Sequence, residues 1–192
     1  MSCDGPSRDQ GGGPPPRSTF PAGHLLARLA WDIVRATLFR PSPALLHGWR
    51  RALLRLFGAR IGRGALVYPT TRIWAPWNLE MADRSTLGPY VDCYCVGRVR
   101  IGQDAVISQY AFLCAAGRDY EREDLPLEIG PIEIGPKAWI GADVFIGPGV
   151  TVGEGAVAGA RSSVFRDVEP WTVVVGTPAR FLKKRILRPP AG

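Results

Sequence analysis

From Ile61 onward, apolar residues recur at every sixth position, and this period constrains the fold more than any other feature of the 192-residue chain. Glycine often follows them, and it does so without interruption at Gly135, Gly141, Gly147 and Gly153. The apolar series comprises Ile61, Val67, Ile73, Leu79, Met81, Leu87, Cys93, Ile101, Ile107, Leu113, Ile134, Ile140, Ile146, Val152, Ala158 and Val164. Strands of a sandwich or barrel alternate with a period of two, so they do not account for this series.

A period of six predicts short strands that each place one side chain inward before a tight corner, so that three strands close a triangular coil of eighteen residues. Ile134 then stacks under Val152, and Ile140 under Ala158. Stacked coils are about 4.8 Å apart, which favours small residues beside the inward position, and we expect glycine there to relieve the backbone of the corner. We therefore predict a mainly β fold, a single-stranded left-handed parallel β-helix. Its hand follows from the repeat signature, since crossovers are usually right-handed.

The rest of the chain divides around this repeat. Residues 1–22 are rich in Gly, Pro and Ser and predict a disordered tail, and residues 23–59 predict amphipathic helices. The β-helix spans residues 60–168. Breaks of two residues at Leu79–Met81 and at Cys93–Ile101 indicate bulges, and the charged segment 118–131 indicates an extruded loop on the binding face. Residues 169–192 form an extension in which Pro178 begins a short basic helix.

The helical segment has apolar residues at helical spacing and Arg28, Asp32 and Arg35 on its other face. Packing across the open end of the core is the favoured interpretation, and docking on an anionic membrane surface is the alternative. No uninterrupted apolar run is long enough to span a bilayer.

Charge and cysteine content exclude several classes of function. Residues 1–60 carry nine Arg and three Asp, residues 61–179 are net acidic, and five basic residues follow. The middle of the chain has no basic stripe for nucleic acid, whereas basic ends suit an anionic cofactor or a membrane surface. The four cysteines follow no secretory signal, so we expect reduced thiols and a cytoplasmic protein that is peripheral to a membrane at most. Cys93 and Cys95 lack the further ligands of a metal site.

Several tracts narrow the assignment beyond the repeat. These are LLRLFGARIG, RIWAPWNLE, ISQYAFLCAAGRDY, AWIGADVFIGPGVTVGEGAVAGARSSVFRDV and the closing GTPAR. With them the chain, from about Leu53 to Arg185, resembles the colanic-acid-biosynthesis branch of the hexapeptide acyltransferases, relatives of the maltose, galactoside and nodulation O-acetyltransferases. The resemblance implies transfer of an acetyl group from acetyl-CoA to a sugar or exopolysaccharide hydroxyl, without a metal, at sites between the subunits of a homotrimer.

The resemblance also shows a departure. The family places its catalytic His five residues after the last apolar position before the loop, and that position is Arg118 here. Arg stays protonated and cannot take a proton, and losing a general base typically costs about a hundredfold to ten-thousandfold in rate. Asp119, an acidic residue of the loop such as Glu121, or Cys114 could compensate, or activity could be lost.

Residue-by-residue matching to the family implies where coenzyme A binds. The predicted coenzyme A residues are Ala142, Ala160, Phe165, Arg166, Arg180 and Lys183. The predicted acceptor contacts are Asp92, Tyr94 and Tyr120, because acidic and aromatic groups are common near sugar sites. The alternative is a non-catalytic β-helix that binds coenzyme A, a glycan or a protein partner without turnover. A β-helical zinc carbonic anhydrase would need three His ligands, and the repeat contains no His.

Overall fold

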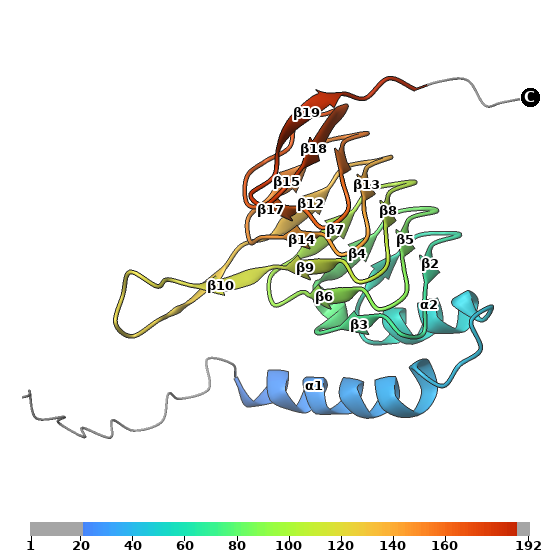
Figure 1. Ribbon diagram of the computed structural model, residues 1–192. Coiled ribbons are helices and arrows are strands. Elements are labelled where there is room, and N and C mark those ends of the chain that lie inside the picture. Colours follow the sequence, from blue (N-terminus) through green and yellow to red (C-terminus); the bar gives the residue numbers. More distant parts are fainter. Residues whose placement is uncertain (1–20, 188–192) are drawn as a thin grey trace, which may run out of the picture.

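Residues 21–187 are described by the computed structural model, in which short parallel strands wind into a stacked triangular β-helix (Figure 1). The strands form three sheets, which we name faces A, B and C, and the chain visits them in that order in each coil. The predicted parallel β-helix is thus confirmed. Of the predicted tail, residues 1–20 lie outside the described residues.

Each face is a ladder of strands that are far apart in the sequence. Face A contains β1 (Arg60–Ile61), β4 (Leu79–Met81), β7 (Val99–Ile101), β12 (Ile132–Ile134) and β15 (Thr151–Val152). Face B contains β2 (Leu66–Val67), β5 (Thr86–Leu87), β8 (Val106–Ile107), β13 (Trp139–Ile140), β16 (Val157–Ala158) and β18 (Thr172–Val175). Face C contains β3 (Arg72–Ile73), β6 (Asp92–Tyr94), β9 (Phe112–Cys114), β14 (Phe145–Ile146) and β17 (Ser163–Val164).

The predicted inward column forms the core. Every member of the six-residue series is buried, and none is more than 7% exposed. Ile134 pairs with Val152 and Ile140 pairs with Ala158, as the eighteen-residue coil predicts. The core is therefore one continuous aliphatic column in which each side chain lies between its equivalents in the neighbouring coils.

The glycine after the inward residue is required by close approach and not by backbone conformation. A Cβ built on Gly135 would lie 2.6 Å from the backbone nitrogen of Glu154 in the next coil, and Gly141 and Gly153 have similarly close neighbours. The left-handed backbone occurs instead three positions after the inward residue, where it is adopted by Arg84 and Asp104 among others. Our expectation that these glycines relieve the corner is corrected accordingly.

The two-residue breaks lengthen strands instead of forming bulges. In β4 both Leu79 and Met81 point inward, and they pair in register with Val99 and Ile101 of β7. The extra residues widen the early coils, and in the first of these coils they include the short 3-10 helix η2 (Pro76–Asn78). Strand β4 still pairs in parallel with β1 and β7, so the stacking of the coils is not interrupted by the wider corner.

The predicted loop at 118–131 is largely a β-hairpin. Strand β10 (Ala116–Arg118) pairs antiparallel with β11 (Leu127–Ile129), and the two carry the chain away from the coils and back (Figure 1). The chain re-enters face A at β12. The hairpin thus starts two residues after β9, a strand of face C.

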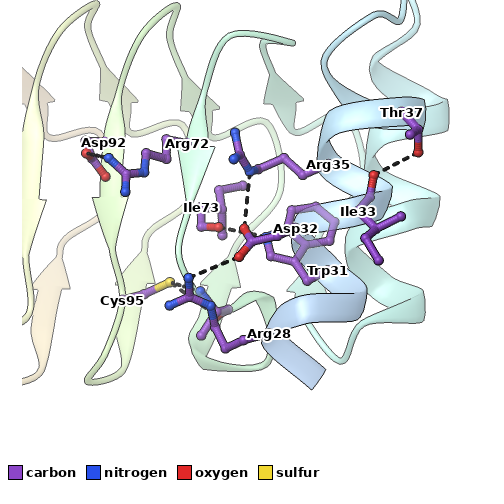
Figure 2. Close-up of polar contacts among 11 residues, drawn as sticks. Arg28, Trp31, Asp32, Ile33, Arg35, Thr37, Arg72, Ile73, Asp92 and Cys95 are labelled. Carbon is purple, nitrogen blue, oxygen red and sulfur yellow. Dashed lines mark hydrogen bonds and ion pairs between the residues drawn. The ribbon is translucent and has the colours of Figure 1, made fainter. Parts of the chain in front are cut away.

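The N-terminal helices cover the first coil, but α1 uses the face that we assigned to solvent. Helix α1 (Ala22–Val34) continues as the π-helical turn η1 (Arg35–Phe39), and α2 (His47–Leu56) packs on β1 and β2. Trp31 is fully buried and donates from its indole Nε1 to the Ile73 carbonyl at 2.7 Å. Figure 2 shows Arg28, Asp32 and Arg35 on the strand side of α1, and Ile33 on the other.

The expected packing across the open end of the core is therefore observed. However, the apolar stripe of α1, which contains Leu25, Leu26, Leu29 and Ile33, is exposed instead of buried. Arg28 lies 4.0 Å above the ring of Trp74 and bonds to Asp32, and Asp32 also contacts Arg35. Leu26, at 68% exposed, is the most exposed of the stripe. Burial of the Trp31 indole and the ion pairs of Asp32 with Arg28 and Arg35 therefore determine which side of α1 faces the coils, and the apolar stripe does not.

The predicted C-terminal helix is wrong, because residues 180–184 form a strand. Strand β19 (Arg180–Lys184) pairs antiparallel with β18 at the end of face B. Strand β18 is the last parallel strand of that face, so its outer N–H and C=O groups need partners. An extended segment satisfies them, and this tertiary pairing overrides the helical tendency of a basic Leu-containing stretch.

The close approach of coils makes a prediction for Gly135→Ala. The added Cβ would overlap backbone atoms of residues 153 and 154, so we expect the free energy of unfolding to fall by about 1–3 kcal/mol. The control is Gly48→Ala in α2, where the nearest atom is an Arg51 side-chain nitrogen at 3.8 Å and stability should be kept. Urea unfolding of both variants measures the difference, and equal stability would contradict the steric explanation.

Candidate functional site

Arg118, where the resemblance predicts a catalytic His, lies on the projecting hairpin. Arg118 is exposed on β10, and its guanidinium Nη1 donates to the Leu125 carbonyl at 2.8 Å across the hairpin. It therefore ties the two arms of the hairpin together. A guanidinium that is permanently protonated and donates to a carbonyl can hold a negative charge, but it cannot accept a hydroxyl proton.

Asp119 is also committed to the local structure of the hairpin. Its backbone N–H donates to the Pro126 carbonyl at 3.1 Å, and its Oδ1 accepts the Glu121 N–H at 3.0 Å. The carboxylate thus stabilises the turn of the hairpin. Tyr120 is 84% exposed beside it. These contacts weaken the hypothesis that Asp119 replaces the missing base.

The other two predicted acceptor contacts lie on the outer side of face C. Asp92 and Tyr94 both belong to β6, whose inward residue is Cys93. Asp92 Oδ2 accepts from Arg72 Nη1 at 3.4 Å on the neighbouring strand (Figure 2). Tyr94 pairs with Cys114, the last residue of β9 before the hairpin. The structure thus places Asp92 and Tyr94 on the surface that leads to the base of the hairpin.

A row of aromatic side chains, which sequence analysis missed, links this surface to the C-terminal end. Neighbouring ring centroids lie 5.4–6.4 Å apart along the row. The row consists of Trp74, Tyr94, Phe112, Phe145 and Phe165. Each member directly precedes or follows an inward residue of face C, so the period that located the core could also have located the row. Aromatic faces of this kind suit the apolar side of a sugar ring or of a pantetheine arm.

Burial changes the proton affinity of Asp92. Its half-buried position raises the pKa of the carboxyl, although the charges of Arg72 and Arg35 act in the opposite direction. Burial likewise raises the pKa of the Cys114 thiol, which donates to the Ala116 carbonyl at 3.1 Å. A neutral thiol that is already bonded is a poor nucleophile, so this geometry does not support the Cys114 hypothesis.

The two histidines lie at the N-terminal end of the molecule. His47 Nδ1 is 3.0 Å from the Val67 carbonyl oxygen, and the ring of His24 packs against those of Trp74 and Trp77. Burial, helped by the charge of Arg28, lowers the pKa of His24. Within residues 21–187, no three His, Cys, Asp or Glu side chains gather as they would around a metal ion.

Three of the predicted coenzyme A residues come together at the C-terminal end of the coils. Phe165, Arg166 and Arg180 line a cavity of about 460 Å³ between the last coil and the β18–β19 pair. Lys183 does not line it, and Lys184 does. Three basic side chains, Arg166, Arg180 and Lys184, thus outnumber the two acidic ones, Asp167 and Glu169, beside an exposed phenylalanine, and a net positive lining suits a nucleotide with phosphates.

The two predicted alanines lie together on a different corner. Ala142 and Ala160 occupy equivalent places in successive coils, where the Arg161 N–H donates to the Ala142 carbonyl at 2.9 Å. Neither alanine lines the cavity, so the structure separates the predicted residues into a small-residue corner and a basic end. A Cβ on the neighbouring Gly141 would lie 2.8 Å from the Ala160 backbone nitrogen, so the coils approach each other closely at this corner.

A second hollow, larger than the cavity at the C-terminal end, contains none of the predicted site residues. It has about 890 Å³ and runs along face A, where Glu80 contacts Arg60, Arg98 and Arg100. Arg100 also contacts Glu133. Because none of the residues that the resemblance assigns to a substrate lies here, we keep the candidate site on face C, the hairpin and the C-terminal end.

Comparison with known proteins identifies the family. No family model matches the chain. It is 40% identical over 167 residues to an Escherichia coli K12 protein assigned as the colanic acid biosynthesis acetyltransferase WcaF, covering 87% of this chain and 92% of the relative. The chain belongs to the hexapeptide-repeat acetyltransferases. This confirms the resemblance, and with it the acyltransferase class that the sequence predicts.

Two solved structures connect the fold to coenzyme A. The hexapeptide-repeat acetyltransferase VCA0836 of Vibrio cholerae, in complex with acetyl-CoA, has a TM-score of 0.77 at 28% identity, over 85% of this chain and 89% of that one. A galactoside acetyltransferase in complex with coenzyme A has a TM-score of 0.75 at 26% identity, over 87% and 84% of the two chains. The predicted donor agrees with what these acetyltransferases bind.

The environment of Asp92 makes a testable contrast with Asp104. Arg84 donates two hydrogen bonds to Asp104, at 2.7 and 2.8 Å, and lowers its pKa. In a carbon-detected NMR titration we expect Asp92 to titrate above the ordinary value of 3.8 and Asp104 below it. Arg72→Ala should raise the pKa of Asp92 further, because it removes a charge that favours the carboxylate.

The raised pKa of Asp92 also determines how the stability of the protein depends on pH. Because native Asp92 keeps its proton to a higher pH than the unfolded chain does, its contribution to the free energy of unfolding falls as pH rises through its unfolded and then its native pKa. Asp92→Asn should remove this pH dependence. Titration of Asp92 at or below the value for Asp104 would contradict the interpretation.

Proposed function

We propose that the protein is an acetyl-CoA-dependent O-acetyltransferase that acts on a sugar or an exopolysaccharide precursor. The main support is the 40% identity to WcaF across nearly its whole length, joined to the likeness to acetyltransferases solved with coenzyme A or acetyl-CoA. Acetyl-CoA is a cytoplasmic donor, so we place the reaction in the cytoplasm. The sites would lie between the subunits of a homotrimer, as the family resemblance implies.

In the proposed reaction a sugar hydroxyl attacks the thioester carbonyl of acetyl-CoA. A carbon–oxygen bond forms, the carbon–sulfur bond breaks, and the hydroxyl proton ends on the departing thiolate. A group that carries this proton speeds the step, and a family His at position 118 would be such a group. Here Arg118 would instead stabilise the negative charge that develops on the carbonyl oxygen or the departing sulfur.

Asp92 is the carboxylate that we propose as proton acceptor. Its burial raises its pKa, which brings a carboxylate closer to the value at which general bases work best. It lies on the outer surface of face C beside Tyr94 and the aromatic row. Asp119, in contrast, uses its Oδ1 to hold the hairpin turn. Tyr94 and Tyr120 would contact the acceptor.

For the donor, we propose that Arg180 and Arg166 hold the nucleotide phosphates and that Phe165 packs against the adjoining part of coenzyme A. The three residues line one cavity. The corner with Ala142 and Ala160 would carry the pantetheine arm past neighbouring coils, where small side chains let a ligand approach the backbone. Lys183, at the edge of face B, would add charge near the phosphates.

One observation favours a second function. Arg118 bonds to the Leu125 carbonyl, so the catalytic position of the family serves here to brace a hairpin. A β-helix with that change could bind coenzyme A, a glycan or a protein partner without turning over. The assay below separates the two functions.

The first test measures release of the coenzyme A thiol from acetyl-CoA in the presence of oligosaccharides with free hydroxyls. We expect a slow, glycan-dependent release by the wild type and a rate at least about a hundredfold higher for Arg118→His, since a general base typically contributes that much. Arg118→Ala is the control for loss of the hairpin bond, and it should not gain activity.

The same assay would also identify a protein that binds without turnover. If the wild type releases no thiol above spontaneous hydrolysis while Arg118→His does, the chain is a binding protein derived from an enzyme. Asp92→Asn should abolish the slow activity of the wild type and leave coenzyme A affinity unchanged. An unchanged rate in Asp92→Asn would eliminate it as the proton acceptor.

The second test addresses the donor site by calorimetric titration with coenzyme A. Arg180→Ala removes a cation from the proposed phosphate site, and charge-assisted hydrogen bonds of this kind are worth about 1.5–3 kcal/mol. We therefore expect the Kd to rise by roughly tenfold or more. Arg63→Ala, which removes another exposed Arg in the first coil, is the matched control and should leave the Kd unchanged. Equal affinity of both variants would place the nucleotide elsewhere.

A further inference from the structure

The outer side of α1 carries an apolar stripe that the fold leaves uncovered. We name the α1 stripe as Leu25, Leu26, Leu29 and Ile33, which are 47–68% exposed. Buried Trp31 marks the side of the helix that faces the coils. Successive residues of an α-helix turn by about 100°, so all four lie within about 60° of the direction opposite Trp31. Burying the stripe against the coils would require pulling Trp31 out.

The stripe therefore points away from the end of the β-helix. Figure 1 shows α1 lying along that end, with the coils on one of its sides only. A subunit packed beside this one, with its coils alongside, would lie next to the coils and not beneath α1. The stripe is thus available to a surface that approaches the end of the molecule.

The charge around the stripe favours one kind of surface. Residues 21–60 form α1, η1, α2 and β1 and carry seven Arg against Asp32 alone, whereas residues 61–187 carry fourteen basic and fourteen acidic side chains. The excess positive charge of the described chain thus belongs to the end where the stripe lies. Arg50 is buried and Arg28 and Arg35 contact Asp32 on the strand side, so the charge that this end presents to solvent comes mainly from exposed Arg40 and Arg55. Two copies meeting end to end would bring these charges together, while an anionic surface would neutralise them.

We propose that this end of the protein docks on an anionic phospholipid bilayer, with the α1 stripe inserted among the lipid headgroups. A helix with one apolar side and cationic surroundings lies in the plane of the interface. Exposed Trp49 donates from its Nε1 to the Leu38 carbonyl beside the end of α1, and indoles favour the headgroup region. Among the described residues no helix is long and apolar enough to cross a membrane, so the contact is peripheral.

The test is sedimentation of the full chain with vesicles. We expect binding to vesicles of phosphatidylcholine with about a third phosphatidylglycerol, and weaker binding to phosphatidylcholine alone. Salt should weaken the binding to the anionic vesicles, because it screens the attraction between Arg side chains and anionic lipids. The variant Leu26→Gln, Leu29→Gln, Ile33→Gln keeps good helix formers at exposed positions, and we expect its affinity for the anionic vesicles to fall roughly tenfold or more.

A matched control is available at the opposite end of the molecule. Leu182, Ile186 and Leu187 are 55–84% exposed, and their replacement by Gln removes as many exposed apolar side chains but should leave vesicle binding unchanged. Circular dichroism checks that both variants remain folded. Equal binding by the wild type and the α1 variant, or no binding by the wild type, overturns the proposal. The proposal is also overturned if the α1 variant binds vesicles as the wild type does but forms a smaller particle in light scattering. The stripe would then contact another copy of the chain.

Discussion

The structure depends on the spacing between stacked coils. Strands hydrogen-bond to their equivalents above and below, so every corner must fit within one inter-strand distance of about 4.8 Å. A Cβ on Gly135 would lie 2.6 Å from the backbone of the next coil. The glycine column is therefore a steric consequence of the hydrogen bonds, and the apolar column inside the coils follows from the same register. Wider early coils are tolerated because Leu79 and Met81 keep that register.

This constraint decides where chemistry can be placed. The inward positions are filled, and small residues are required where a corner closely approaches the next coil, as at Gly135. Large or charged groups stand at other corner positions such as Arg84 and Asp104, on the outer side of a strand, at the ends, or on a segment that leaves the stack. The candidate site uses the last three places: Asp92 and the aromatic row on face C, the basic C-terminal end, and the hairpin that carries Arg118. The hairpin escapes the stacking rule and can change its residues without disturbing the core.

The sequence predicts what the six-residue period controls and fails where tertiary contacts compete with local pattern. The core column and the pairing of Ile134 with Val152 follow from the period alone. The C-terminal helix was wrong because β18 offers an unpaired edge to the residues after Pro178. In α1 the apolar stripe was expected to pack on the coils, but Trp31 is the side chain that fills their open end. The aromatic row was missed because the period was used only to locate the inward residues, while Tyr94 and Phe165 were predicted as separate contacts of the acceptor and of coenzyme A.

In the candidate site too, the sequence predicted some features and missed those that depend on tertiary contacts. Matching to the family located Phe165, Arg166 and Arg180, which do share a cavity, but it could not show that Asp119 holds a turn or that Asp92 is half-buried. If position 118 is where the family has its His, as the resemblance implies, Arg118 leaves no proton carrier there and supplies a fixed cation that bonds across the hairpin. A site so altered can still position two substrates, and positioning contributes more to many reactions than one base does. Slow transfer is therefore compatible with this geometry, provided that a carboxylate with a raised pKa takes the proton.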